Sequence, residues 1–255
     1  MEDIAHEVKP EAVIHLAAVS SVDACEGDPV LAHSVNTIGA RRVCKCFQES
    51  AETIVFASSA AVYGAGAMRT ERSDLCGKEA GVYANTKRVA EMYVALAEKI
   101  PNRVVLRFSN VYGPGGHGVL NTWTTKLVAG QRVELRGNGK QTRDFVWVGD
   151  IAHAIRLVIE HPVPGAFNVS TGTNVSIVDA LWRVYGTVHS WKNERNAVAR
   201  LEELTAKVPA RSADIQTSSL DPSEFKATFG WSPDTPLARG LAELADHAES
   251  TCVDK

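Results

Sequence analysis

Short apolar runs alternate with longer stretches of helical spacing along the first half of the chain. The runs are rich in β-branched residues, which is typical of strands buried in a parallel sheet. The predicted strands are 13–18, 53–57 and 103–107. Apolar side chains three or four positions apart predict helices between them. These predicted helices are 2–9, 29–50 and 82–100. Alternating strands and helices predict a doubly wound α/β sheet.

Beyond residue 118 the apolar spacing becomes shorter and mixed, which predicts a smaller α+β lobe. Its candidate elements are strands at 133–135 and 167–170 and helices at 177–185 and 237–248. A helix at 151–160 follows the segment 143–150. We therefore expect one domain over 1–112, to which 143–162 returns. The segments 113–142 and 163–255 should form the lobe.

Composition narrows the possible functions. The 255 residues are 45% apolar and 22% charged, which favours one folded domain or one and a half. A net charge of −3 gives no electrostatic reason to expect nucleic acid or an anionic membrane as partner. No apolar run is long enough to span a bilayer, and the acidic start has no signal-peptide pattern. The five scattered cysteines and eight histidines show no metal-site spacing, so we predict no metal and a cytoplasmic protein.

Tyr83 and Lys87 are candidate catalytic residues because side chains four positions apart project from one face of a helix. A free tyrosine, with a pKa of about 10, is a poor base near neutrality. A nearby ammonium would lower that pKa and favour acid–base work. Ser59, just after the predicted strand 53–57, could bind the substrate oxygen that exchanges its proton with the tyrosine. By itself such a pair is also typical of a solvated helix face.

Two segments read together carry a family resemblance: Ser58-Ser59-Ala60-Ala61-Val62-Tyr63-Gly64 and Tyr83-Ala84-Asn85-Thr86-Lys87. They resemble the extended branch of the short-chain dehydrogenase/reductase superfamily, the NAD-dependent epimerases and dehydratases, and most of all its UDP-glucose-type 4-epimerases. The segment 107–114 resembles the family's R-x-x-N-V-Y-G-P, and 143–152 resembles its R-D-F-x-x-V-x-D-x-A. The resemblance spans essentially the whole chain, although 186–208 match poorly. It implies a Rossmann-like dinucleotide-binding domain, truncated at its N-terminal side, and a substrate-binding lobe.

The resemblance also implies roles for individual residues. Tyr83 would take the proton of the sugar 4-hydroxyl, Lys87 would lower the tyrosine pKa and bind the nicotinamide ribose, and Ser59 would bind the 4-oxygen. The implied cofactor-binding residues are Ala17, Ala18, Asn36, Ser58, Tyr83 and Lys87. The implied substrate-binding residues are Asn110, Arg143 and Arg211. Interpretations without a ligand role stay open for several of them: tight packing for the two alanines, an exposed polar residue for Asn36 and a turn for Asn110.

The N-terminal part of the family pattern has no counterpart here. The family opens with a strand, a glycine-rich turn and a helix that binds the pyrophosphate, and no such segment precedes residue 13. A G-x-G-x-x-G match at 113–118 is not assigned to the cofactor, because Pro114 lacks an N–H and no strand leads directly into the match. We expect residues 1–255 by themselves to bind NAD weakly and to show no epimerase activity.

The implied function is an NAD-dependent nucleotide-sugar epimerase of carbohydrate metabolism that acts by transient oxidation at C4. The resemblance also implies a homodimer, and NADP stays open as cofactor. A 4,6-dehydratase is disfavoured because Ala60 and Ala61 stand where those enzymes carry an acid pair. A keto-sugar reductase is a further alternative. So is a catalytically silent remnant that binds a nucleotide sugar or a partner. The sugar and its nucleotide stay open.

Overall fold

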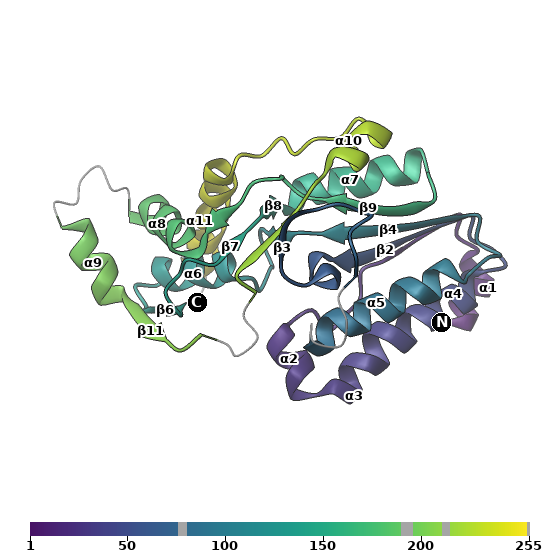
Figure 1. The fold of residues 1–255 in the computed structure, drawn as a ribbon, viewed down its shortest axis with the longest axis horizontal. Coiled ribbons are helices and arrows are strands. Elements are labelled where there is room, and N and C mark those ends of the chain that lie inside the picture. Colours follow the sequence, from purple (N-terminus) through teal and green to yellow (C-terminus); the bar gives the residue numbers. More distant parts are fainter. Residues whose placement is uncertain (76–80, 190–195, 211–214, 254–255) are drawn as a thin grey trace.

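The computed structural model describes residues 1–75, 81–189, 196–210 and 215–253. A part built on a parallel sheet lies at the right of Figure 1, and a smaller lobe lies at its left. The N-terminus is beside the sheet, and the C-terminal end is in the lobe.

Four parallel strands form the main sheet, in the order β1-β2-β4-β9. They are β1 (Ala12–His15), β2 (Thr53–Ser59), β4 (Asn102–Phe108) and β9 (Gly165–Val169). Ile54 and Phe56 of β2 contribute to one core, and Val55 contributes to another. Because successive side chains of a strand point to opposite faces, the sheet is covered on both sides. The predicted doubly wound α/β fold is therefore confirmed.

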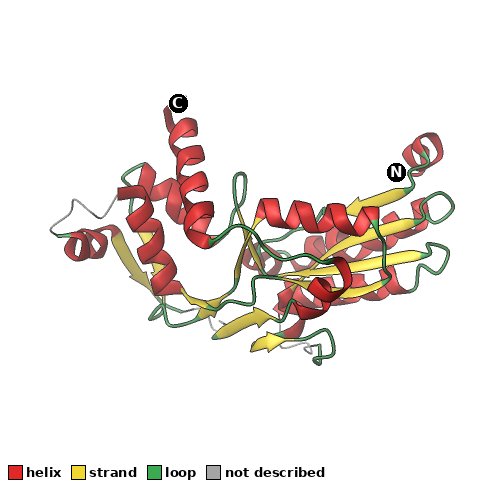
Figure 2. Cartoon of the chain, turned by 90° about the horizontal axis from the view of Figure 1, so that it is seen from above, coloured by secondary structure: helices red, strands yellow, loops and turns green. Residues whose placement is uncertain are grey.

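Helices cover the two faces of the main sheet, as Figure 2 shows from above. One layer consists of α1 (Glu2–Val8), α2 (Val22–Gly27), α3 (Pro29–Ala32), the π-helix η1 (His33–Ile38), α4 (Gly39–Phe47) and α5 (Gly81–Ala95). The opposite layer consists of α7 (Val148–Glu160) and α10 (Ser223–Phe229). The predicted helix 29–50 is thus one helical path with a π-helical segment in its middle.

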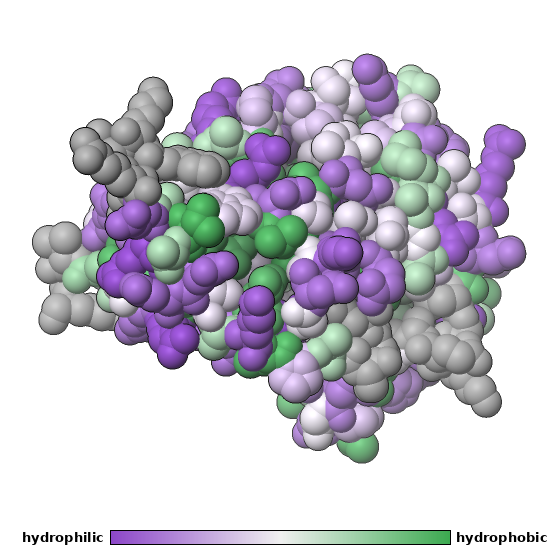
Figure 3. Space-filling model, turned by 60° about the vertical axis from the view of Figure 1, so that its left-hand side comes forward, coloured by the Kyte–Doolittle hydropathy of each residue, from purple (hydrophilic) through white to green (hydrophobic). Residues whose placement is uncertain are grey.

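Small sheets and four helices form the lobe. One sheet, here called the lobe sheet, has the order β10-β7-β12-β3, and two further strand pairs are β11-β6 and β5-β8. The strands are β3 (Gly66–Arg69), β5 (Asn110–Tyr112), β6 (Val133–Arg136), β7 (Thr142–Arg143), β8 (Phe145–Trp147), β10 (Val175–Ser176), β11 (Thr205–Val208) and β12 (Thr217–Leu220). The helices are α6 (Val119–Val128), α8 (Ile177–His189), α9 (Ala197–Leu204) and α11 (Leu237–Val253). Figure 3 shows the lobe side, where polar side chains surround small groups of apolar ones.

The predicted domain boundary at residue 163 is wrong. Segment 165–169 forms β9 at the edge of the main sheet, where it pairs with β4. Its Phe167 packs against Phe225 of α10, with ring centroids 6.0 Å apart. The lobe sheet in turn includes β3, which comes from the first part of the chain. Each part thus contributes a strand to the sheet of the other. The sequence did not reveal this, because local apolar spacing does not show which distant strand a segment pairs with.

The apolar spacing that predicts the helix 82–100 also predicts its buried stripe, and the structure corrects most of it. The predicted stripe is Val82, Thr86, Val89, Tyr93, Leu96 and Ile100. The helix ends at Ala95, and Leu96, placed in that stripe, is 68% exposed. Within α5 the buried residues are Ala84, Thr86, Lys87, Ala90, Glu91 and Val94, so Thr86 is the one member of the predicted stripe that is buried there. The two alanines allow α5 to approach β2 closely, and the two charged groups find partners inside the protein. The face that contains Lys87 is therefore a core face.

Within the described residues, no helix combines the length and the apolar character that crossing a bilayer requires. The same residues contain no cluster of three histidine, cysteine or acidic side chains that could hold a metal ion.

Candidate active site

The site is built at the carboxyl edge of the main sheet, where β2 ends in Ser59. The Ser59 hydroxyl accepts a hydrogen bond from the N–H of Ala61 over 3.2 Å, which starts the 3₁₀ turn η2 (Ala60–Tyr63). Helix α5 packs on β2, and Tyr83 lies in its first turn. The carboxyl ends of parallel strands are the usual location of ligand sites in such sheets.

Hydrogen bonding with the Ser59 hydroxyl is one of the influences on the pKa of the Tyr83 phenol, which places the two side chains close together. Burial of the phenol raises the pKa of Tyr83, the bond with Ser59 lowers it in part, and the Cys25 thiol raises it. The structure thus brings together the two residues for which the sequence predicted a joint role. At neutral pH, the phenol is protonated and able to donate.

Lys87 lies one helical turn after Tyr83 and is only 3% exposed. Its ammonium donates a hydrogen bond to the carbonyl oxygen of Ala57 over 2.7 Å and lies 5.0 Å from the ring centroid of Phe56. Burial lowers the pKa of Lys87 to about 8, although the nearby Cys25 and Glu91 raise it. The predicted lowering of the Tyr83 pKa is wrong for the chain by itself, because burial dominates and the ammonium is bound to β2.

Asn36 holds the loop that follows β1. It is 1% exposed, accepts the N–H of Val19 over 2.7 Å and donates to the carbonyl of Val19 over 3.1 Å. Its amide also donates to the hydroxyl of Thr86 on α5 over 3.0 Å. Both amide hydrogens and the oxygen are therefore engaged within the protein. This arrangement makes Asn36 a link between the loop and α5, and excludes the exposed position that the sequence left open.

Three other predicted cofactor residues lie near this edge in different surroundings. Ala17 is exposed and Ala18 is half-buried, both in the loop after β1, because β1 ends at His15 rather than at residue 18. The Ser58 side chain is buried and donates to the carboxylate of Glu91. Its hydroxyl is therefore directed toward the interior, away from the position expected of a cofactor ligand.

The predicted substrate residues occupy the junction with the lobe. The Asn110 side chain donates to the carbonyl of Asp144 over 3.1 Å. On β7, Nη1 of Arg143 donates to the carbonyls of Thr142 and Ile215, over 2.8 and 2.6 Å. Arg211 lies outside the described residues. The structure ties Asn110 and Arg143 to neighbouring backbone, and their predicted roles toward a substrate stay predictions.

Sequence reasoning missed several buried polar residues around the site. Glu91, Arg107, Asp144 and His15 are each at most 7% exposed. Nε2 of His15 has no hydrogen-bond partner in the part of the chain that the structure describes, and burial followed by the charge of Lys87 lowers the pKa of this histidine. A signal for Glu91 exists in the sequence, because it lies four residues after Lys87 on the same helix face.

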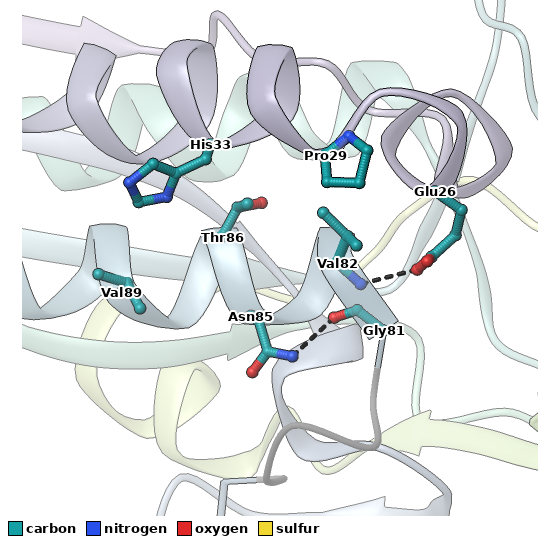
Figure 4. Close-up of a pocket in the computed structure, with 8 residues that line it drawn as sticks. All are labelled: Glu26, Pro29, His33, Gly81, Val82, Asn85, Thr86 and Val89. Atoms are coloured by element: carbon teal, nitrogen blue, oxygen red, sulfur yellow. Dashed lines mark hydrogen bonds between the residues drawn. The ribbon is translucent and has the colours of Figure 1, made fainter.

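A groove of about 380 Å³ lies between α3, η1 and the outer side of α5, as Figure 4 shows. It is lined by Glu26, Pro29, His33, Gly81, Val82, Asn85, Thr86 and Val89. At its end, the Glu26 carboxylate accepts the N–H of Val82 over 2.7 Å and so satisfies the first turn of α5. None of Ser59, Tyr83 and Lys87 lines this groove, so it is separate from the candidate active site.

Comparison with known proteins gives a family match over residues 1–170, to the NAD dependent epimerase/dehydratase family. A UDP-glucose 4-epimerase of Mycolicibacterium smegmatis is 29% identical over 251 residues, which is 94% of this chain and 76% of the relative. A putative UDP-glucose 4-epimerase of Methanocaldococcus jannaschii is 28% identical, over 92% of this chain and 76% of the relative.

Solved structures resemble this chain over nearly its whole length. A UDP-glucose 4-epimerase of Thermotoga maritima, with UDP-glucose, has a TM-score of 0.88 at 26% identity, covering 98% of this chain and 81% of its own. A UDP-glucose 4-epimerase of Thermus thermophilus, in complex with NAD, has a TM-score of 0.85 at 29% identity. The match covers 97% of this chain and 80% of the Thermus thermophilus chain.

Proposed function

The chain belongs to the NAD dependent epimerase/dehydratase family, whose members are enzymes, and we propose that its site epimerises a nucleotide sugar at C4 by transient oxidation. The observation that carries this proposal is the proximity of Ser59 and Tyr83 at the carboxyl edge of a parallel sheet, with Lys87 one turn along α5. The similar proteins bound to UDP-glucose and to NAD support a nucleotide sugar and NAD as its ligands.

In this mechanism Ser59 binds the sugar O4 and Tyr83 exchanges a proton with it. Removal of that proton from O4 and of a hydride from C4 leaves a 4-keto sugar, and return of the hydride to the opposite face of C4 and of the proton to O4 gives the epimer. NAD, when bound, supplies the hydride acceptor and a positive charge near the phenol. Because burial raises the pKa of Tyr83, the chain by itself holds this residue in its acid form. Tyr83 is therefore ready to return the proton, and needs a nearby positive charge to act as a base.

The residues present fit the nicotinamide end of NAD. Lys87 is bound to the Ala57 carbonyl of β2, and the buried Nε2 of His15, which senses the charge of Lys87, is without a partner among the described residues. Ala17 and Ala18 would contact the dinucleotide from the loop after β1, which Asn36 holds in place. Ser58 would not contact NAD directly, because its hydroxyl is bound to Glu91; it would influence the cofactor site only through that residue.

A dehydratase would need an acid pair just after Ser59. The turn η2 has Ala60 and Ala61 at these positions, which favours epimerase over dehydratase chemistry. A keto-sugar reductase would use the same proton-transfer pair. A second candidate function is binding of a nucleotide sugar without turnover. It is favoured by the burial that keeps Tyr83 protonated, since a protonated phenol cannot take the proton of the sugar hydroxyl.

We also propose a cytoplasmic homodimer. Large apolar side chains are exposed on α3 and at the end of α5, where Val30 is 80% and Leu96 is 68% exposed. Association would remove them from water. Light scattering should give twice the mass of the chain, and Leu96→Glu should give the mass of one chain.

The epimerase proposal is tested with two forms of the protein. One is residues 1–255, and the other carries an added N-terminal strand, glycine-rich turn and helix of the Rossmann type. Each is incubated with NAD and UDP-galactose, and the anomeric protons of the sugars are followed by NMR. We expect UDP-glucose from the extended form, and binding without turnover from residues 1–255. An extended form that binds both ligands and yields neither epimer nor ketone would contradict the proposal.

A further inference from the structure

A buried ion pair joins the strand that ends in Ser59 to the helix that carries Tyr83. We propose that Glu91 and Arg107 position Ser59 against Tyr83 by binding Ser58, which precedes Ser59, and Tyr63, the last residue of the turn that follows it. This inference rests on the proposed function, because only proton transfer gives the Ser59–Tyr83 pair a role in turnover. Glu91 and Arg107 are positioning residues in this account and do not touch the substrate.

The ion pair is bidentate and almost closed to solvent. Nε of Arg107 lies 3.0 Å from Oε1 of Glu91, and Nη2 lies 2.6 Å from Oε2. The two side chains are 7% and 9% exposed. A bidentate contact fixes the orientation of both planar groups as well as their distance. Glu91 therefore has one defined place relative to β4, where Arg107 is located.

Residues on both sides of Ser59 are hydrogen-bonded to this ion pair. On one side, the Ser58 hydroxyl donates to Oε1 of Glu91. On the other, Nη1 of Arg107 donates to the hydroxyl of Tyr63 over 2.7 Å, and the guanidinium lies 4.9 Å from the ring centroid of Tyr63. The Tyr63 hydroxyl in turn donates to Asn168 over 2.8 Å. Ser59 thus lies between two residues, at 58 and 63, that one ion pair holds.

The same carboxylate also fixes the helix. Glu91 follows Lys87 by four residues and Tyr83 by eight, so the three lie along one side of α5. Strand pairing aligns Ser58 with Arg107 in neighbouring strands. A shift of α5 along its axis would break the bonds of Glu91 to Ser58 and Arg107 together. The pair therefore couples the axial position of Tyr83 to the position of Ser59.

Stability alone is a weak reason for this arrangement. Replacing a buried ion pair by apolar side chains of similar volume is often neutral or stabilising. Removing one partner is costly, because it leaves a buried charge without its counterion. A pair that acts only in the core should therefore be replaceable as a unit without any effect on Ser59 or Tyr83.

The test is the pKa of Tyr83, measured by NMR of protein carrying ¹³Cζ-tyrosine. The variants are Ser58→Ala, which cuts one link, and the double variant Glu91→Leu/Arg107→Met, which removes both charges of the ion pair together. Ser59→Ala is the reference for complete loss of the hydrogen bond. Glu160→Gln is the matched control, because it breaks an exposed ion pair with Arg156 on α7.

We expect both variants to raise the pKa of Tyr83, as Ser59→Ala does, because the bond with Ser59 lowers it. The double variant removes one negative and one positive charge, so its net charge is unchanged, and Ser58→Ala removes no charge; a rise in both therefore reports lost positioning. Turnover of the extended form should fall by about a hundredfold with little change in KM, as expected for misplaced reacting groups. Glu160→Gln should change neither quantity.

Folded variants in which the Tyr83 pKa stays at its wild-type value would overturn the proposal. If the double variant does not fold, Ser58→Ala decides, since it removes only one hydroxyl. Failure of the proposed function is a separate result, because the pKa is read without turnover. If the wild type shows no turnover but the variants still raise the pKa of Tyr83 above its wild-type value, the positioning proposal is supported and the epimerase proposal is contradicted.

Discussion

The ammonium nitrogen of Lys87 donates to the carbonyl oxygen of Ala57 over 2.7 Å, and so binds helix α5 to the strand that ends in Ser59. Burial of this charge lowers the pKa of Lys87 to about 8. The lysine therefore begins to lose its proton slightly above neutral pH. Both the stability of the protein and the charge beside Tyr83 should depend on pH in this range.

Stability should rise with pH between about 8 and 10 because of Lys87. Below pH 8 the lysine is protonated in both the folded and the unfolded chain. Between the lowered pKa and the ordinary value of 10.5, the unfolded chain holds a proton that the folded chain has lost. The free energy of unfolding then rises, by at most about 1.4 kcal/mol per pH unit. Lys87→Met should remove this increase, as measured by denaturant unfolding across the range.

Lys99→Met is the control for this measurement, because the Lys99 side chain is 61% exposed. Its unfolding free energy should follow the wild-type pH dependence. A constant difference between wild type and Lys87→Met from pH 7 to 10 would show that Lys87 titrates normally.

Tyr83→Phe should abolish turnover of the extended form and leave nucleotide-sugar binding nearly unchanged. The substitution removes only the hydroxyl that transfers the proton, so the loss should appear in kcat rather than in KM. The matched control is Tyr93→Phe, ten residues further along the chain, where the half-buried ring lies 5.9 Å from the Arg41 guanidinium. Equal turnover in wild type and Tyr83→Phe would end the assignment.

Arg143→Ala should weaken nucleotide-sugar binding without changing the proton-transfer step. A charge-assisted hydrogen bond to a diphosphate contributes about 1.5 to 3 kcal/mol, which isothermal calorimetry would detect. Arg183→Ala removes an exposed arginine of α8 and serves as control. Because Arg143 also binds the carbonyl of Ile215, thermal unfolding of each variant is measured in parallel. Binding equal to that of wild type would contradict the substrate role.

Asn36→Leu should destabilise the protein and release the loop after β1. The substitution leaves the N–H and carbonyl of Val19 without their partner, at a cost of about 1 to 3 kcal/mol for each buried group. Hydrogen exchange of the Val19 amide should accelerate, while Asn174→Leu, at an exposed position, should leave it unchanged. Slow exchange in Asn36→Leu would show that the loop is held by other contacts.

The sequence by itself determined the class of the fold and the choice of Ser59, Tyr83 and Lys87 as candidate catalytic residues. Apolar runs located β2 and β4, because strands buried on both faces need continuous apolar residues. The four-residue interval between Tyr83 and Lys87 placed them on one helix face, because the helical repeat is a local property. Ser59 followed from its position at the end of an apolar run.

The tertiary structure decided which face of α5 is buried and what burial does to its charges. The predicted stripe was right only for Thr86 and Ile100, because helical spacing defines faces without saying which one meets the sheet. The pKa of Tyr83 is raised rather than lowered because burial depends on β2 and on the helices that cover it. The Glu91–Arg107 pair joins positions 16 residues apart on different elements, and its value depends on desolvation that only packing creates.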